Sequence, residues 1–174
     1  MTATQDGSAP DVPRRHAPVS LEEAAWLHGA GQGRPEDLPM TAAEALAAGW
    51  DTPALRELAG LPRTADSRYI GEVFEQALSE AGIALPDHNL ARRHLLRRLA
   101  VGFLAGEVDL AGLASDDWWE TEAETAQERA LMALLPYCAC CIPRTPELDQ
   151  EAWERQLRSA ALALASCPAI GPGA

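Results

Sequence analysis

Residues 87–106 read DHNLARRHLLRRLAVGFLAG, and this stretch decides the fold. Asp87 follows a proline and is typical of a helix N-cap, and Gly106 is typical of a helix end. Between them, apolar residues recur at helical spacing and form a broad apolar face. The stretch therefore predicts a long helix through Leu104, which we expect at the centre of the fold. Its apolar face consists of Ala91, Leu95, Leu96, Leu99, Ala100, Phe103 and Leu104.

Helix start and stop signals recur on both sides of this stretch. Some starts are capping boxes, in which Ser or Thr precedes Glu by three residues, and others place proline at the first helical position. Trp50 lies between two of the predicted helices, and we expect it to wedge them together. Helices are predicted to begin at Ser20, Thr41, Thr52, Asp66 or Ser67, Glu120 or Thr121, and Thr145, and to end near Ala30, Gly49, Gly60, Gly82, Leu135 and Ser166.

Composition supports a helical reading of the whole chain. The apolar fraction is 47%, but alanine and leucine supply much of it, and Val and Ile are scarce. Such a composition favours helix over sheet. A chain of 174 residues suits one domain. We predict an all-α, single-domain irregular bundle of about six to eight helices over residues 20–167, with a disordered tail at 1–19 and a loose tail at 168–174.

The formal net charge of −12 restricts the partners of this chain. Phosphate contacts need a cationic face, so nucleic acid and anionic membranes are poor partners, and a protein with a basic surface is a good one. All fourteen basic residues are arginine, which we attribute to coding bias rather than to selected recognition. The N-terminal residues have no apolar signal-peptide region, and no apolar run reaches the length of a membrane span. We expect a cytoplasmic protein.

Residues 107–128, here called the acidic segment, contain eight acidic residues and no basic one. In the predicted helix, Glu120, Glu124 and Glu128 share one face because they are four residues apart. Adjacent Trp residues on a helix point about 100° apart, so one of the pair is expected at the surface, where Trp often anchors an interface. The alternative is a merely solvated face. The predicted partner-binding residues are Trp118, Trp119, Asp116, Asp117, Glu120 and Glu124.

Three of the four cysteines lie in YCACC, residues 137–141. Cys138 and Cys141 form one C-x-x-C, and Cys167 would join them at a zinc ion if the last helix folds back. The second C-x-x-C of a typical zinc site is absent, and no strand precedes this one as in thioredoxin-like proteins. The alternative is that these cysteines are small packing residues. No other cofactor is expected.

A cluster of basic residues on the central helix raises the question of an anionic ligand. Arg93, His94 and Arg97 would form a clamp for phosphate or carboxylate. The alternative is that the arginines pair with the surplus of Glu and Asp inside the molecule.

One short segment carries a resemblance. Residues 46–61 read LAAGWDTPALRELAGL, which resembles small uncharacterised all-helical proteins of actinobacterial type. The resemblance covers about a tenth of the chain. It implies a helical fold and no activity.

The sequence contains no Gly-rich phosphate loop, no G-x-S-x-G and no H-E-x-x-H. We therefore predict a non-enzymatic acidic helical protein that binds a protein partner, as a regulator, an adaptor or an inhibitor of immunity type. One alternative is a thiol or metal protein that uses the cysteine cluster. Another is a small-ligand-binding or enzymatic bundle, which would need a cavity of mixed polarity beside the central helix.

Overall fold

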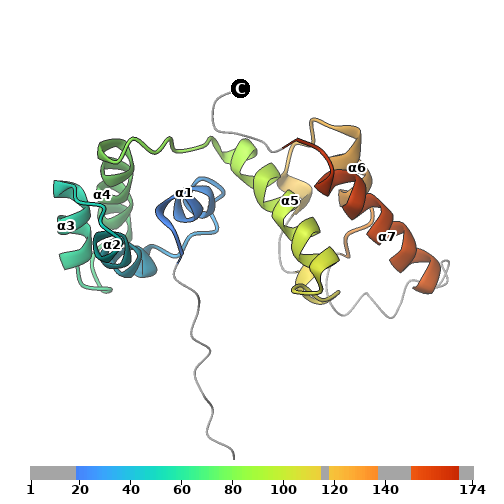
Figure 1. The fold of residues 1–174 in the computed structure, drawn as a ribbon, viewed down its shortest axis with the longest axis horizontal. Coiled ribbons are helices and arrows are strands. Elements are labelled where there is room, and N and C mark those ends of the chain that lie inside the picture. Colours follow the sequence, from blue (N-terminus) through green and yellow to red (C-terminus); the bar gives the residue numbers. More distant parts are fainter. Residues whose placement is uncertain (1–18, 115–117, 137–149, 169–174) are drawn as a thin grey trace, which may run out of the picture.

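The computed structural model describes residues 19–114, 118–136 and 150–168, and all regular structure in these ranges is helical (Figure 1). This confirms the all-α prediction, and the seven α-helices of these ranges fall within the predicted number. They are α1 (Leu21–Gly29), α2 (Leu38–Ala47), α3 (Pro53–Gly60), α4 (Ser67–Glu80), α5 (His88–Ala105), α6 (Ala126–Met132) and α7 (Gln150–Ala165). Short 3-10 turns lie at η1 (Pro35–Asp37), η2 (Gly112–Ala114) and η3 (Trp118–Glu120). The two predicted tails lie almost wholly outside the described residues.

Most of the predicted helix ends are confirmed. For the central helix α5, Asp87 Oδ1 accepts a hydrogen bond from Leu90 N at 2.9 Å, and Gly106 ends the helix in the left-handed conformation at φ 78°. These contacts satisfy backbone groups that the first and last turns of a helix leave unpaired. Ser20, Thr52 and Asp66 cap α1, α3 and α4 in the same way.

The buried apolar side chains form two clusters. Figure 1 shows α2, α3 and α4 together on one side, α5, α6 and α7 on the other, and α1 between them. The first cluster joins α1 to α2, α3 and α4, and the second joins the end of α1 to α5, α6 and α7. The largest fully buried side chains of the first cluster are Leu55, Leu58, Ile70, Phe74 and Leu78, and those of the second are Leu96, Leu113, Leu131 and Leu157.

Helix α1 contributes to both clusters. Leu21, Ala24 and Ala25 belong to the first cluster, and Ala30, just after α1, belongs to the second. The end of α1 approaches the start of α5 closely. A Cβ on Gly29 would lie 2.8 Å from the Pro86 carbonyl oxygen and 3.2 Å from Ala91 Cβ. Only glycine fits this contact without a shift of the neighbouring backbone.

Two predictions about α2 are wrong. The helix begins at Leu38 and not at Thr41, because η1 leads directly into it. Thr41 is therefore in the helix interior, where its hydroxyl lies 3.4 Å from the Asp37 carbonyl oxygen. Trp50 does not wedge α2 and α3 together. Its backbone N–H binds the Ala45 carbonyl, but its side chain is 40% exposed.

The predicted helix from Glu120 to Leu135 is also wrong in its bounds. Helix α6 begins at Ala126 and ends at Met132, and η3 precedes it. Thr125 is the N-cap, and it forms a full capping box with Glu128. A T-x-x-E signature is present in the sequence at this point, and it marks the true start of the helix. The predicted start of the last helix at Thr145 lies outside the described residues.

We predict that Gly29→Ala destabilises the protein, because the added methyl group has no space against Pro86. The expected loss is about 1–3 kcal/mol of unfolding free energy, the usual range for overpacking. Gly60→Ala is the matched control, since nothing lies within 4 Å of a Cβ at that position. It should raise stability by about 0.5–1 kcal/mol, because alanine restricts the unfolded chain. Urea unfolding followed by circular dichroism measures both, and equal effects would contradict the close contact at Gly29.

Candidate functional site

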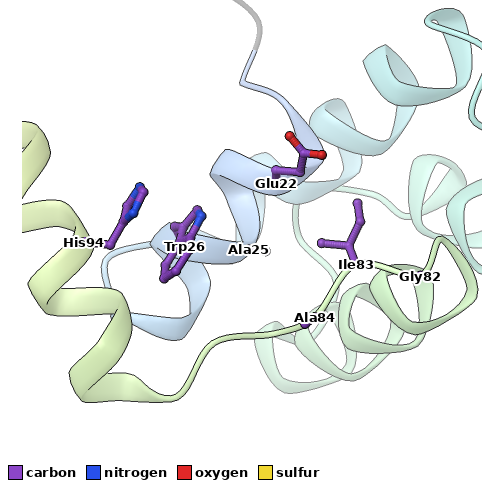
Figure 2. A pocket seen from close by; sticks show the side chains of 7 residues that line it. All are labelled: Glu22, Ala25, Trp26, Gly82, Ile83, Ala84 and His94. Carbon is purple, nitrogen blue, oxygen red and sulfur yellow. The ribbon is translucent and has the colours of Figure 1, made fainter. Parts of the chain in front are cut away.

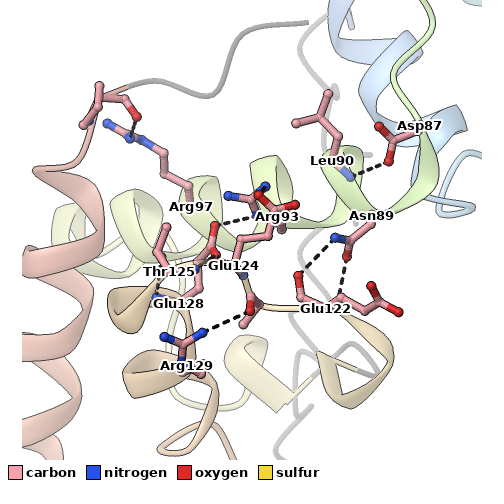
Figure 3. Close-up of polar contacts among 12 residues, drawn as sticks. Asp87, Asn89, Leu90, Arg93, Arg97, Glu122, Glu124, Thr125, Glu128 and Arg129 are labelled. Atoms are coloured by element: carbon pink, nitrogen blue, oxygen red, sulfur yellow. Dashed lines mark hydrogen bonds and ion pairs between the residues drawn. The ribbon is translucent and has the colours of Figure 1, made fainter. Parts of the chain in front are cut away.

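The acidic segment runs back along α5, from the end of that helix towards its start. It leaves α5 after Gly106 and meets it again at Asn89, a separation of roughly 25 Å along the helix. At that point the Asn89 side chain donates to the Glu122 carbonyl at 3.0 Å and accepts from Glu122 N at 2.8 Å (Figure 3). Both backbone polar groups of Glu122 are thereby satisfied.

Arginines of α5 hold the segment against the helix. Arg92 Nε donates to Thr121 Oγ1 at 2.9 Å, and its guanidinium carbon lies 5.6 Å from the centre of the Trp118 ring. Arg93 Nε donates to Glu128 Oε1 at 2.8 Å, and its Nη1 lies 2.6 Å from Glu124 Oε2. Both arginines are buried.

Glu128 is 1% exposed, yet its pKa is lowered, which favours the ionised form, and its contacts explain why. Burial has the largest single effect on the pKa of Glu128 and would raise it. Hydrogen bonds from Thr125 N–H, Arg93 and Glu124 N–H, together with the Arg93 charge, outweigh burial and hold the pKa below its ordinary value. Glu128 thus joins the capping box of α6 to an ion pair with α5.

This arrangement corrects the prediction for the acidic segment. Glu120, Glu124 and Glu128 do not share a helical face, since they lie in η3, in the turn before α6 and inside α6 respectively. Trp118 is 5% exposed and belongs to the second cluster, so its ring is not a surface anchor. The structure does not describe the side chain of Trp119, and Asp116 and Asp117 lie outside the described residues.

Other carboxylates of the acidic segment stay at the surface. Glu107, Glu120 and Glu122 are exposed, and none of the three has an ion-pair partner among the described residues. Glu124 is also exposed, but it is engaged by Arg93.

The three predicted ligand residues on α5 do not converge. Arg93 faces the acidic segment, while Arg97 donates to the Ala165 and Pro168 carbonyls at 2.8 and 2.5 Å, at the end of α7 (Figure 3). His94 faces α1. Arg93 therefore pairs with Glu124 and Glu128, as the alternative interpretation held, whereas Arg97 binds backbone carbonyls and no carboxylate.

The cysteine prediction falls mainly outside the described residues, which include neither Cys138 nor Cys141. Cys167 is a free thiol whose sulfur lies 3.4 Å from the Ala163 carbonyl oxygen. Within residues 19–114, 118–136 and 150–168, no group of three or more His, Cys, Asp or Glu side chains is placed to hold a metal ion.

A pocket of about 500 Å³ lies beside α5, where α1 meets the connection between α4 and α5 (Figure 2). We call it the junction pocket. It is lined by Glu22, Ala25 and Trp26 of α1, by residues 82–84, and by His94 of α5. Its lining is of mixed polarity, with a carboxylate, an imidazole, an indole and aliphatic side chains.

Trp26 and His94 form one wall of the junction pocket. Their ring centres are 3.9 Å apart and their planes differ by 5°, so the rings are stacked. Burial, and secondarily the charge of Arg97, lowers the pKa of His94. This favours the neutral form of the imidazole at pH 7.

Sequence analysis missed the pocket residues Trp26 and Glu22, and it missed the capping box and buried ion pair of Glu128. Trp26 is 68 positions from His94, and no local pattern pairs residues at that distance. Glu22 lies within the capping box that Ser20 forms with Glu23 and carried no signal of its own. The signal for Glu128 was present, because Thr125 and Glu128 have capping-box spacing, but the expected helix began too early.

No protein-family model, curated protein or solved structure matches this chain. In the part of the chain that the structure describes, no helix is long and apolar enough to cross a membrane.

We predict that Glu128→Ala destabilises the protein by about 3 kcal/mol. This is the lower end of the range for removing one partner of a buried ion pair, because Glu124 still faces Arg93. The lowered pKa means that ionised Glu128 stabilises the fold above its ordinary pKa, and that this contribution is lost as pH falls through the folded value. The difference in unfolding free energy between Glu128→Ala and the wild type should therefore become smaller at acidic pH. Chemical denaturation at pH 7 and at lower pH measures it, with exposed Glu107→Ala, expected within about 0.5 kcal/mol, as the control.

We predict that His94 titrates below the ordinary histidine value of about 6.5. Trp26→Ala removes a ring that shields the imidazole from water, so it should move the pKa of His94 back towards that value. The neutral ring stabilises the fold above pH 6.5, and this contribution is lost as pH falls through the lowered folded pKa. Ring-proton shifts followed by NMR against pH measure both forms. Titration of His94 at or above its ordinary value in the wild type would contradict the buried stack.

Proposed function

We propose that this chain is a non-enzymatic helical protein that binds a protein partner with a basic surface, as a regulator, an adaptor or an inhibitor of immunity type. The acidic segment is the proposed binding surface. The absence of the catalytic motifs named above from the sequence favours binding over catalysis.

The observation that carries this proposal is the uneven use of charge. Arg92, Arg93 and Arg97 are engaged by acceptors of their own chain. Glu107, Glu120 and Glu122 are exposed and are not paired with these arginines. The chain as a whole has a net charge of −12. Arg129 donates to the Ala123 carbonyl rather than to these carboxylates. Exposed carboxylates with no ion-pair partner among the described residues attract a basic surface, speed its encounter and repel acidic proteins.

Rigid backbone support also favours this surface. Asn89 fixes the backbone of Glu122, and the capping box fixes the start of α6. A surface that is ordered before binding loses less conformational entropy when a partner docks. Trp119 is adjacent to Glu120 in the chain, and we include it as the proposed apolar contact.

We predict that Glu120→Gln with Glu122→Gln weakens partner binding by about tenfold or more, because two unpaired carboxylates lose their charge. The wild type is used to capture the partner, which is then purified, and its affinity is measured at low and at physiological salt. Higher salt should weaken the wild-type complex.

The matched control is Glu44→Gln with Glu72→Gln, which changes the net charge equally on α2 and α4. It should bind as the wild type does. A second arm, Trp119→Ala, tests the apolar contact. Equal loss in the two double variants would mean that net charge matters and the acidic segment does not.

A further inference from the structure

We propose that the junction pocket binds a small organic cation, a guanidinium or primary ammonium group carried on a short apolar stem. This site is separate from the acidic segment, and the proposal does not depend on the proposed function. It rests on the chemistry of the walls that meet in the pocket.

The first wall offers the face of an indole. His94 covers one face of Trp26 by stacking, and Trp26 itself lines the pocket, with the α1 backbone at Ala25 between the indole and Ile83 in Figure 2. A ligand in the pocket therefore meets the part of the indole that His94 leaves uncovered. A tryptophan face attracts cations because its ring carries negative charge above and below the plane, and guanidinium groups also stack on it.

The second feature is the Glu22 carboxylate. Glu22 precedes Trp26 by four residues on α1, so the two side chains lie on the same side of the helix, about one turn apart. Glu22 is exposed and has no ion-pair partner among the described residues, whereas its neighbour Glu23 contacts Arg98. A cation on the Trp26 face therefore has one free carboxylate within reach.

The opposite wall of the pocket offers aliphatic contacts to the apolar stem and also favours a positively charged ligand. It consists of Gly82, Ile83 and Ala84, which directly follow the C-terminal end of α4. The last carbonyl groups of a helix carry partial negative charge, which favours a cation. The side chains of Ile83 and Ala84 supply the aliphatic surface.

Positive groups close to the pocket are turned away or neutral. Arg97 binds the carbonyls at the end of α7, and Arg98 binds Glu23. Burial and the charge of Arg97 lower the pKa of His94, which favours its neutral form. An anionic ligand would find no cation in this lining, so the pocket selects positive over negative charge.

The test uses n-butylguanidinium and n-butylammonium as probes and n-butylurea as the neutral analogue of the first. Binding is followed by NMR through the Trp26 indole N–H and the His94 ring, assigned from the spectra of Trp26→Phe and His94→Ala. Both cations should give saturable shifts at these two rings, and butylurea should bind about tenfold more weakly. Glu22→Gln should weaken cation binding by about tenfold, while the charge-matched Glu44→Gln should leave it unchanged.

Two further measurements complete the test. The first asks whether the cation belongs to a polypeptide or to a free small molecule, and the second asks whether the junction pocket acts independently of the acidic segment. N-acetyl-arginine amide carries the same group on a peptide backbone. Tighter binding than butylguanidinium assigns the pocket to a polypeptide side chain, and weaker binding assigns it to a free small molecule. Glu120→Gln with Glu122→Gln should not change probe binding, so failure here and failure of the partner surface are distinguishable. Equal binding of butylurea, no effect of Glu22→Gln, or no shift at either ring would overturn the proposal.

Discussion

A helix of nine residues is marginal in water by itself, and α1 is nine residues long. Its stability comes from packing on both sides. Leu21, Ala24 and Ala25 are buried in the first cluster, with side chains of α2, α3 and α4, while Trp26 stacks on His94 of α5. The two hydrophobic clusters are thus joined through one short element, together with the α4–α5 connection. Everything at the junction, including the pocket, depends on α1 being held from both sides.

The arginines of α5 solve a second problem, which is how an acidic chain folds back along a helix. Like charges in the acidic segment repel one another, and Arg93 offsets this by meeting both Glu124 and Glu128. Burying a charged pair costs solvation, and the pair is tolerated because the carboxylate of Glu128 also accepts two backbone hydrogen bonds. The buried carboxylate of this segment, Glu128, therefore has ion-pair and hydrogen-bond partners. The exposed carboxylates of Glu107, Glu120 and Glu122 have no ion-pair partner among the described residues.

Local signals in the sequence predicted the fold well, because a helix cap involves residues only three or four positions apart. Asp87 and Gly106 bound α5 as expected. Prediction failed where a distant contact competes with a local pattern. Thr41 and Glu44 have capping-box spacing, yet η1 carries the helix back to Leu38. Trp118 was included among the partner-binding residues because one of two adjacent Trp residues on a helix was expected at the surface, whereas Arg92 and the second cluster bury it. The junction pocket had no sequence signal, since its walls come from three separate elements.

The junction pocket and the acidic segment lie on different sides of the same helix. Consecutive residues of a helix point about 100° apart, so Arg92 and Arg93 meet the acidic segment while His94 meets α1. A ligand changes an equilibrium only by binding its states unequally. If α5 stays rigid, a cation binds the pocket equally tightly whatever the conformation of the acidic segment. Coupling between the two surfaces would require α1 to separate from α5, because the Trp26–His94 stack is the contact that a pocket ligand shares with α5.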